Sequence, residues 1–181
     1  GRSDRGSRFK ASDLMFLDES RCNTDMTRRY AYSLGGSRAV DSAPLSKPKN
    51  TTILSSIQFD GTLRYTTFSG GTTVERFKRY LETDLLPHLN GNSVLIMDNM
   101  KSHHAKAVKN LLDSSEIRYI YLPPYSPDLN SIEKLWSKVK SFLRKFKART
   151  LDALPNAIQN AFHSVTISDC SGWFRFCGYA L

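Results

Sequence analysis

Two aspartates stand where carboxylates could bind a cation. Asp18 comes at the end of an apolar run, after Phe16-Leu17, and Asp98 directly follows the apolar run VLIM at 94–97. In open α/β sheets, ligands bind beyond the carboxyl ends of the strands. If the two runs are neighbouring strands, the carboxylates converge at one edge and repel each other unless a cation lies between them. Oxygen ligands with open positions suit Mg²⁺ or Mn²⁺.

A third carboxylate would complete the set of ligands, and the candidate is Glu133. It lies in the stretch LPPYSPDLNSIEKLW at 122–136, where three prolines precede a helix that starts near Asn130. Proline fixes its own φ and restricts the residue before it, so this loop gives the helix a rigid start. Such rigidity would hold Glu133 in place against Asp18 and Asp98, as a metal site requires.

Each of the three acids also has a simpler interpretation. An aspartate at a strand end commonly forms a turn or caps a following helix. The spacing Asn130-x-x-Glu133 fits a capping box, in which the Glu133 side chain would reach back to the Asn130 amide. For each residue taken singly, the sequence leaves this interpretation open beside the metal site.

The helix predicted at about 130–147 has an apolar stripe and a charged face. Lys140 and Arg144 follow Glu133 along this charged face, because offsets of 7 and 11 residues are close to two and three helical turns. An acid followed by cations is typical of a metal ligand at the end of a phosphate track, and ordinary solvated faces show the same pattern. Flanking the charged face are Lys134, Lys138 and Lys145. The apolar stripe consists of Ile132, Leu135, Trp136, Val139, Leu143 and Phe146.

The elements that position these residues follow from periodicity and turn signals. Apolar and β-branched runs predict strands at 14–20, 30–34, 51–59, 63–68, 94–97 and 117–122. Helical spacing predicts helices at 74–86 (capped by Thr72 or Thr73), 104–113, about 130–147, 151–163 and 169–178. Asp60-Gly61 joins two of the strands and predicts a hairpin. This order predicts an α/β fold with a mixed central sheet and helices on both faces.

Composition favours a single globular domain with a polyanionic partner. The chain has 181 residues, of which 40% are hydrophobic and 11% aromatic, and this suits one full core. Its 26 Lys and Arg against 17 Asp and Glu give a net charge of +9. An excess of this size indicates nucleic acid as the commonest partner, although a merely soluble basic surface would have the same composition.

Cysteine usage and hydropathy exclude several other classes of protein. The three cysteines, Cys22, Cys170 and Cys177, form no C-x-x-C pair, which argues against a disulfide framework or zinc site and for a reducing compartment. No apolar run approaches the roughly 18 residues that span a bilayer, so no membrane partner is expected. The polar N-terminus is no signal peptide and lacks an initiator Met, which predicts a fragment or a processed product.

Three blocks of the sequence resemble the DDE transposases of the IS630/Tc1/mariner superfamily, and the bacterial IS630 branch fits best. The block FLDES resembles the family's Asp-Glu after the first strand, which makes Asp18 the match. The block VLIMDNMKSHH resembles its apolar strand with Asp-Asn and a following His, matched by Asp98 and His103. The third block resembles the run Pro-Tyr-Ser-Pro-x-Leu-Asn-x-Ile-Glu-x-x-Trp and begins at Pro124, with Ser131 where the family usually has Pro. Glu133 stays in register, with 34 residues between it and Asp98.

The resemblance, which covers about 14–147, implies an RNase H-like fold and a metal-dependent site. Asp18, Asp98 and Glu133 would be the catalytic and metal-binding residues, holding Mg²⁺ or Mn²⁺, with two ions expected. The partner would be double-stranded DNA, both transposon ends and target, bound by a homodimer in the synaptic complex. The residues expected to contact DNA are Asn99, His103, Lys140 and Arg144.

The resemblance also implies an organisation of the chain. We expect a polar tail at 1–13, a DDE catalytic core at 14–148 and a helical extension of the same domain at 149–181. Family members carry a helix-turn-helix region ahead of the core, and residues 1–13 could not form one. The expected location is the cytoplasm, with the nucleoid, in a bacterium, or the nucleus in a eukaryote.

Three functions remain open at this stage. The first is a transposase catalytic domain that cleaves DNA and transfers strands, the second another RNase H-like endonuclease, and the third a non-catalytic DNA-binding remnant. The intact set of acids favours the first two. Glu19 is left out of the site because neighbouring side chains of a strand point to opposite faces, and Trp136 is assigned to the core rather than to base stacking.

Overall fold

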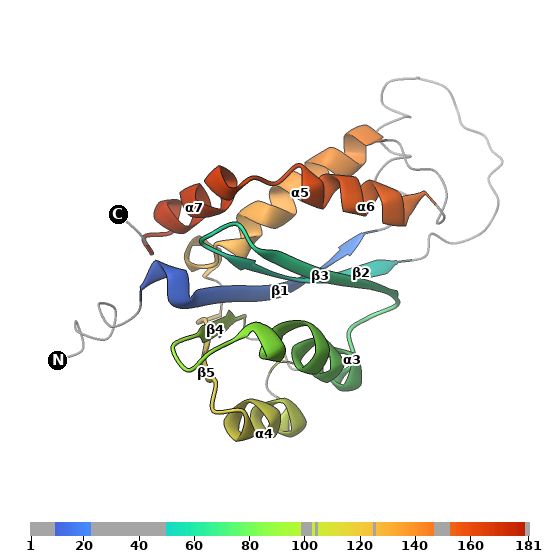
Figure 1. The fold of residues 1–181 in the computed structure, drawn as a ribbon. Helices are drawn as coiled ribbons and strands as arrows, with labels where there is room; N and C mark the ends of the chain where they lie inside the picture. Colours follow the sequence, from blue (N-terminus) through green and yellow to red (C-terminus); the bar gives the residue numbers. More distant parts are fainter. Residues whose placement is uncertain are drawn as a thin grey trace.

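A computed structural model of the chain describes residues 10–22, 50–98, 103, 105–124, 126–146 and 153–179 (Figure 1). A five-stranded sheet in the order β3-β2-β1-β4-β5 forms its centre. The strands are β1 (Leu14–Cys22), β2 (Thr51–Gln58), β3 (Leu63–Ser69), β4 (Val94–Met97) and β5 (Arg118–Tyr121). Each lies within two residues of a predicted strand, and the strand predicted at 30–34 falls outside the described residues.

The sheet is mixed, as the sequence predicts. β1 pairs antiparallel with β2 and β2 with β3, whereas β4 is parallel to both β1 and β5. The predicted hairpin joins β2 to β3. Its turn is closed by the Gln58 amide donating to the Thr62 carbonyl, N to O 3.1 Å, and Gly61 takes a φ of +93° that favours glycine.

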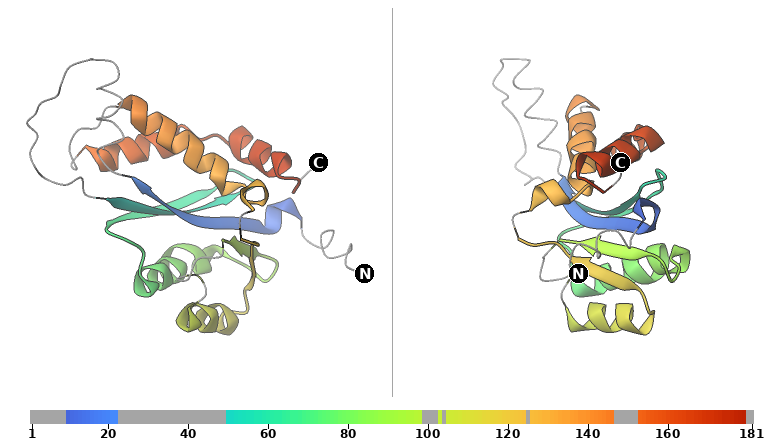
Figure 2. Two further views of the ribbon diagram at one scale, coloured as in Figure 1. Left: turned by 180° about the vertical axis from the view of Figure 1, so that it is seen from behind. Right: turned by 90° about the vertical axis from the view of Figure 1, so that its left-hand side faces the viewer.

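Helices cover both faces of the sheet (Figures 1 and 2). On one face lie α3 (Val74–Tyr80) and α4 (Lys106–Ser114), and on the other α5 (Ile132–Phe146), α6 (Leu154–His163) and α7 (Ile167–Phe176). In the part of the chain that the structure describes, no helix is long and apolar enough to span a membrane.

Several helix boundaries differ from the prediction, and α6, predicted to begin at 151, begins at Leu154. The predicted helix at 74–86 changes after Tyr80 to a π-helical turn (Leu81–Leu85) and a 3-10 turn (Leu86–His88), because Pro87 has no N–H to continue the α-helical ladder. α4 begins at Lys106 rather than at 104. α7 begins at Ile167 rather than at 169, because the Thr166 side chain accepts from the Asp169 amide in a capping box.

The core has two halves, one on each side of the sheet. Phe16 on β1 packs with the α5 to α7 layer, whereas its neighbours Met15 and Leu17 pack with α3 and α4. β1 is therefore apolar on both faces, which explains its continuous hydrophobic run. The C-terminal helices share this core, since Phe174 of α7 is fully buried with its ring centroid 5.1 Å from that of Phe16.

Candidate active site

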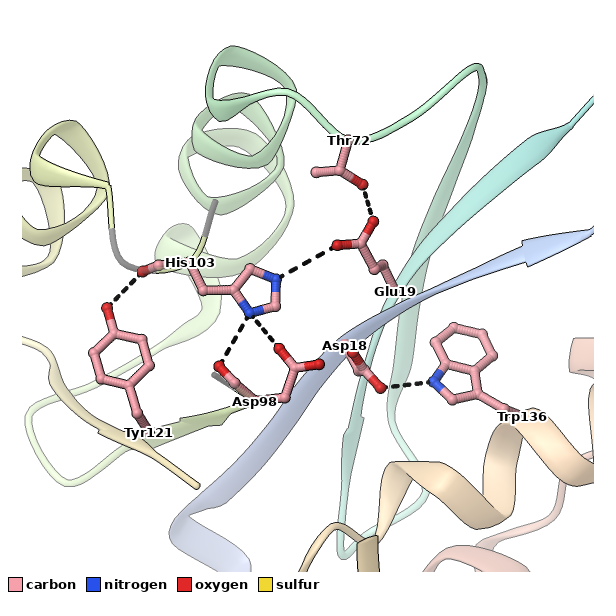
Figure 3. Close-up of polar contacts among 7 residues, drawn as sticks. All are labelled: Asp18, Glu19, Thr72, Asp98, His103, Tyr121 and Trp136. Carbon is pink, nitrogen blue, oxygen red and sulfur yellow. Dashed lines mark hydrogen bonds and ion pairs between the residues drawn. The ribbon is translucent and has the colours of Figure 1, made fainter. Parts of the chain in front are cut away.

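Asp18 and Asp98 meet at the carboxyl edge of the sheet. β1 and β4 are parallel neighbours in which Leu17 pairs with Met97, so the next residue on each strand is one of the two aspartates. The prediction that both lie on adjacent strands is confirmed. The two side chains interact, since the charge and hydrogen bond of Asp98 act on Asp18, and Figure 3 shows them at the strand ends, with Asp98 next to His103 and Asp18 next to Trp136.

The contact between the two acids is electrostatically unfavourable when both are ionised. Burial first, then the charge and hydrogen bond of Asp98, and last the charge of Glu133 together raise the pKa of Asp18 to about 9. Only 4% of Asp18 is exposed. A shared proton or a cation between the two carboxylates would relieve this repulsion.

Trp136 fixes the orientation of Asp18. Its indole Nε1 donates to Asp18 Oδ2 at 3.1 Å, from the first turns of α5 across to β1 (Figure 3). The assignment of Trp136 to the core is confirmed by its 4% exposure, but the hydrogen bond was missed. The signal that could have found it is general: a buried tryptophan N–H needs a partner.

Glu133 stands at the rim of the site. It lies in the first turn of α5 and is exposed. The capping box is not formed, because the buried Oδ1 of Asn130 has no hydrogen-bond partner among the described residues. The Glu133 amide instead donates to the Asn130 backbone carbonyl, N to O 3.1 Å. The carboxylate is thus available at the site, close enough that its charge acts on Asp18.

The structure brings together two of the three predicted ligands. Within the described ranges, no group of three or more His, Cys, Asp or Glu is arranged to hold a metal ion. Asp18 and Asp98 are in contact, and Glu133 acts on Asp18 through its charge.

His103 lies beneath Asp98 rather than on the surface. Its Nδ1 is 2.7 Å from Asp98 Oδ1 and 3.4 Å from the Asp98 carbonyl oxygen. The ring is fully buried and stacks on Phe77, with centroids 4.4 Å apart. The DNA contact expected of His103 stays a prediction, and in this structure the ring contacts a carboxylate of the site. The predicted helix start at 104 is also wrong, since α4 begins later.

Three predicted DNA contacts remain, Asn99, Lys140 and Arg144. Asn99 falls outside the described residues. Arg144 is exposed and Lys140 partly exposed on α5. Burial raises the pKa of the Cys22 thiol to about 11, and the charge of Lys140 opposes this shift.

Two of the flanking lysines have partners on α7. Lys134 Nζ lies 4.1 Å from the centroid of the Phe176 ring, and Lys138 Nζ lies 2.5 Å from Asp169 Oδ2. Both lysines contact α7 from α5, so they do not extend the charged face of Glu133, Lys140 and Arg144.

Comparison with known proteins gives consistent matches. A model of the DDE superfamily endonucleases matches residues 13–155. The transposable element Tc1 transposase of Caenorhabditis elegans is 27% identical over 97 residues, which are 51% of this chain and 36% of that protein.

Among solved structures, a pre-cleavage Mos1 transpososome superposes with a TM-score of 0.72 at 17% identity, over 96% of this chain and 54% of that chain. The Mos1 transposase catalytic domain with raltegravir and Mg gives a TM-score of 0.71 at 16% identity, over 96% of this chain and 81% of that one. The chain thus spans about half of the Mos1 chain and about a third of the Tc1 transposase.

The RNase H-like fold predicted from the sequence is confirmed by these structures. The family match covers all three predicted acids. The chain therefore belongs to the DDE superfamily of endonucleases.

Proposed function

We propose that this domain cleaves DNA strands and transfers them to a target by metal-dependent in-line attack on phosphodiesters. The observation that carries the proposal is the contact between the carboxyl groups of Asp18 and Asp98 at the carboxyl ends of two parallel strands. Membership of the DDE endonucleases supports the same reaction class.

The donor chemistry of the site fits a divalent cation. Two carboxyl groups in contact, one of them buried, are stabilised when a cation takes the place of the shared proton. Asp18, Asp98 and Glu133 would hold Mg²⁺ or Mn²⁺, and Mos1 catalytic domains have been solved with each of these metals. Bound there, two such ions would neutralise charge on the attacking and leaving oxygens of the displacement.

The chain's own residues supply positioning. Trp136 holds one oxygen of Asp18, and His103 holds one oxygen of Asp98. Glu133 reaches the same edge from a helix that packs on β1. The attacking group would be a water for cleavage or a DNA 3′-hydroxyl for strand transfer. The proposed partner is double-stranded DNA, with a homodimer joining two transposon ends, in line with the Mos1 transpososome.

Metal removal tests the proposal directly. The domain, incubated with supercoiled plasmid and Mg²⁺ or Mn²⁺, is expected to nick it, because the acids alone repel each other and the phosphate. Excess EDTA should stop the reaction, and added Mg²⁺ should restore it. Product is measured as relaxed plasmid on a gel. Nicking at an unchanged rate in EDTA would contradict the mechanism, and nicking without joining of 3′-ends would favour the alternative of another endonuclease.

A second prediction concerns the path of the DNA. Lys140 and Arg144 lie on the Glu133 face of α5. The charge of Lys140 opposes the rise in the pKa of Cys22, which comes four residues after Asp18 on β1. We expect Lys140→Ala and Arg144→Ala each to weaken duplex binding without sequence preference. Each should also flatten the log–log salt dependence by about 0.9, the value for one lost phosphate contact. The measurement is fluorescence anisotropy at several salt concentrations.

Arg79→Ala is the matched control for the DNA path. Arg79 is exposed but lies on α3, in the layer across the sheet. Its loss should leave affinity and slope unchanged, and none of the three variants should change thermal stability much, because exposed charges contribute little. Equal slopes for Lys140→Ala, Arg144→Ala and Arg79→Ala would place the DNA on another surface.

A further inference from the structure

The side of the sheet opposite Asp18 carries a second acid with no role in the proposed reaction. Glu19 follows Asp18 on β1 and points into the layer of α3, as Figure 3 shows. Its side chain is only 7% exposed. A buried carboxylate is costly unless its oxygens have partners, so its surroundings indicate what it does.

Both oxygens of Glu19 face specific groups. The Thr72 hydroxyl, from the segment ahead of α3, donates to Oε2. Oε1 faces Nε2 of His103 at 3.9 Å. Among the described residues neither of these two atoms has a hydrogen-bond partner, although both are buried. Each is therefore the nearest group able to satisfy the other, and a small approach would close the contact.

His103 connects this acid to the site. While Nε2 faces Glu19, Nδ1 contacts the Asp98 carboxylate at 2.7 Å. The ring cannot turn freely, because it stacks on Phe77 and the backbone carbonyl of His103 accepts from the Tyr121 hydroxyl at 2.5 Å. The contacts run from Thr72 through Glu19 and His103 to Asp98, at the end of β4 (Figure 3).

We propose that Glu19 is a positioning residue for the metal site, acting on Asp98 through the imidazole of His103. Oε1 of Glu19 orients the imidazole through Nε2. Nδ1 of the ring in turn contacts Oδ1 of Asp98, so that the second oxygen of Asp98 faces Asp18. Outer groups of this kind orient ligands and commonly change metal affinity by about 10- to 100-fold when removed. The inference rests on the proposed function, since it takes Asp98 to be a metal ligand.

Binding of Mn²⁺ tests the role of Glu19, measured as loss of the free-ion EPR signal during titration of the protein. Glu19→Ala is expected to raise the dissociation constant by about 10- to 100-fold. Glu19→Gln should give a smaller rise, because the amide keeps the shape and the contact with Thr72. In plasmid nicking, Glu19→Ala should need correspondingly more Mg²⁺ for half-maximal rate but approach the wild-type rate at saturation. A merely structural loss would lower the rate at every metal concentration.

Glu82→Ala is the matched control, since Glu82 is an exposed acid of the same layer that pairs with Lys78, Nζ to Oε1 3.7 Å. It should bind Mn²⁺ as the wild type does. Equal affinity for Glu19→Ala, Glu82→Ala and wild type would overturn the inference. If Glu19→Ala fails to fold, equal affinity for Glu19→Gln and wild type would overturn it as well. Asp18→Asn and Asp98→Asn are titrated with Mn²⁺ in parallel. If neither variant binds Mn²⁺ more weakly, the proposed function itself fails. If both bind it more weakly but Glu19→Ala does not, only this inference is overturned.

Discussion

Replacing Asp18 by Asn, Asp98 by Asn or Glu133 by Gln is expected to lower the rate of plasmid nicking by at least about 10³-fold. Removing one ligand withdraws several kcal/mol of transition-state charge stabilisation, and about 4 kcal/mol corresponds to this factor. The rate is measured at saturating Mg²⁺. Asp128→Asn is the matched control, because Asp128 is exposed in the turn just ahead of α5 and touches none of the three acids in the described contacts.

The same Asp18→Asn variant should be more stable than the wild type when no divalent metal is present. The pKa of Asp18 is raised in the folded state to about 9 from an ordinary 3.8. A pKa raised on folding contributes to the free energy of unfolding. This contribution is fully present below about pH 4 and is lost as pH rises toward 9. Asparagine does not ionise, so the advantage of the variant should grow between these limits. Urea denaturation at pH 5, 7 and 8.5 measures it, and a variant that is inactive and also less stable at pH 8.5 would indicate misfolding rather than loss of a ligand.

Replacing Phe174 by Ala is expected to destabilise the whole domain by about 3–5 kcal/mol, the usual cost of removing a buried phenylalanine. Phe174 is fully buried, and its ring contacts Phe16 at 5.1 Å and Phe59 at 5.7 Å between centroids. These partners belong to β1 and to the end of β2, so α7 is packed against the strand that carries Asp18. The free energy of unfolding is measured by urea denaturation.

Phe176→Ala is the control on the same helix. Phe176 is 72% exposed and contacts Lys134, so its loss should cost less than about 1 kcal/mol. A single unfolding transition that Phe174→Ala shifts to lower urea concentration would show that the C-terminal helices unfold together with the sheet. Two separate transitions, with only the smaller one shifted, would show instead that residues 149–181 are a separate unit and not an extension of the same domain.

Several features of this protein were determined by local sequence. The hairpin at Asp60-Gly61 and the cap at Thr73 follow from turn and capping chemistry, which acts over a few residues. The parallel pairing that joins Asp18 to Asp98 was predictable because both acids follow apolar runs, and such runs become the buried central strands of a sheet. The family match agrees with the three blocks recognised in the sequence.

Other features were decided only by the tertiary structure. Side-chain alternation correctly places Glu19 on the face opposite Asp18. Sequence alone does not show that His103 contacts both Glu19 and Asp98. Lys138 looks like part of the charged face in sequence, but α7 brings Asp169 to it. The sequence predicts Trp136 as a core residue, but only the fold shows that its N–H donates to Asp18 on β1. Periodicity determines which way a side chain points within its own element, whereas its partner depends on which distant element packs there, and that is settled by the burial of the whole core.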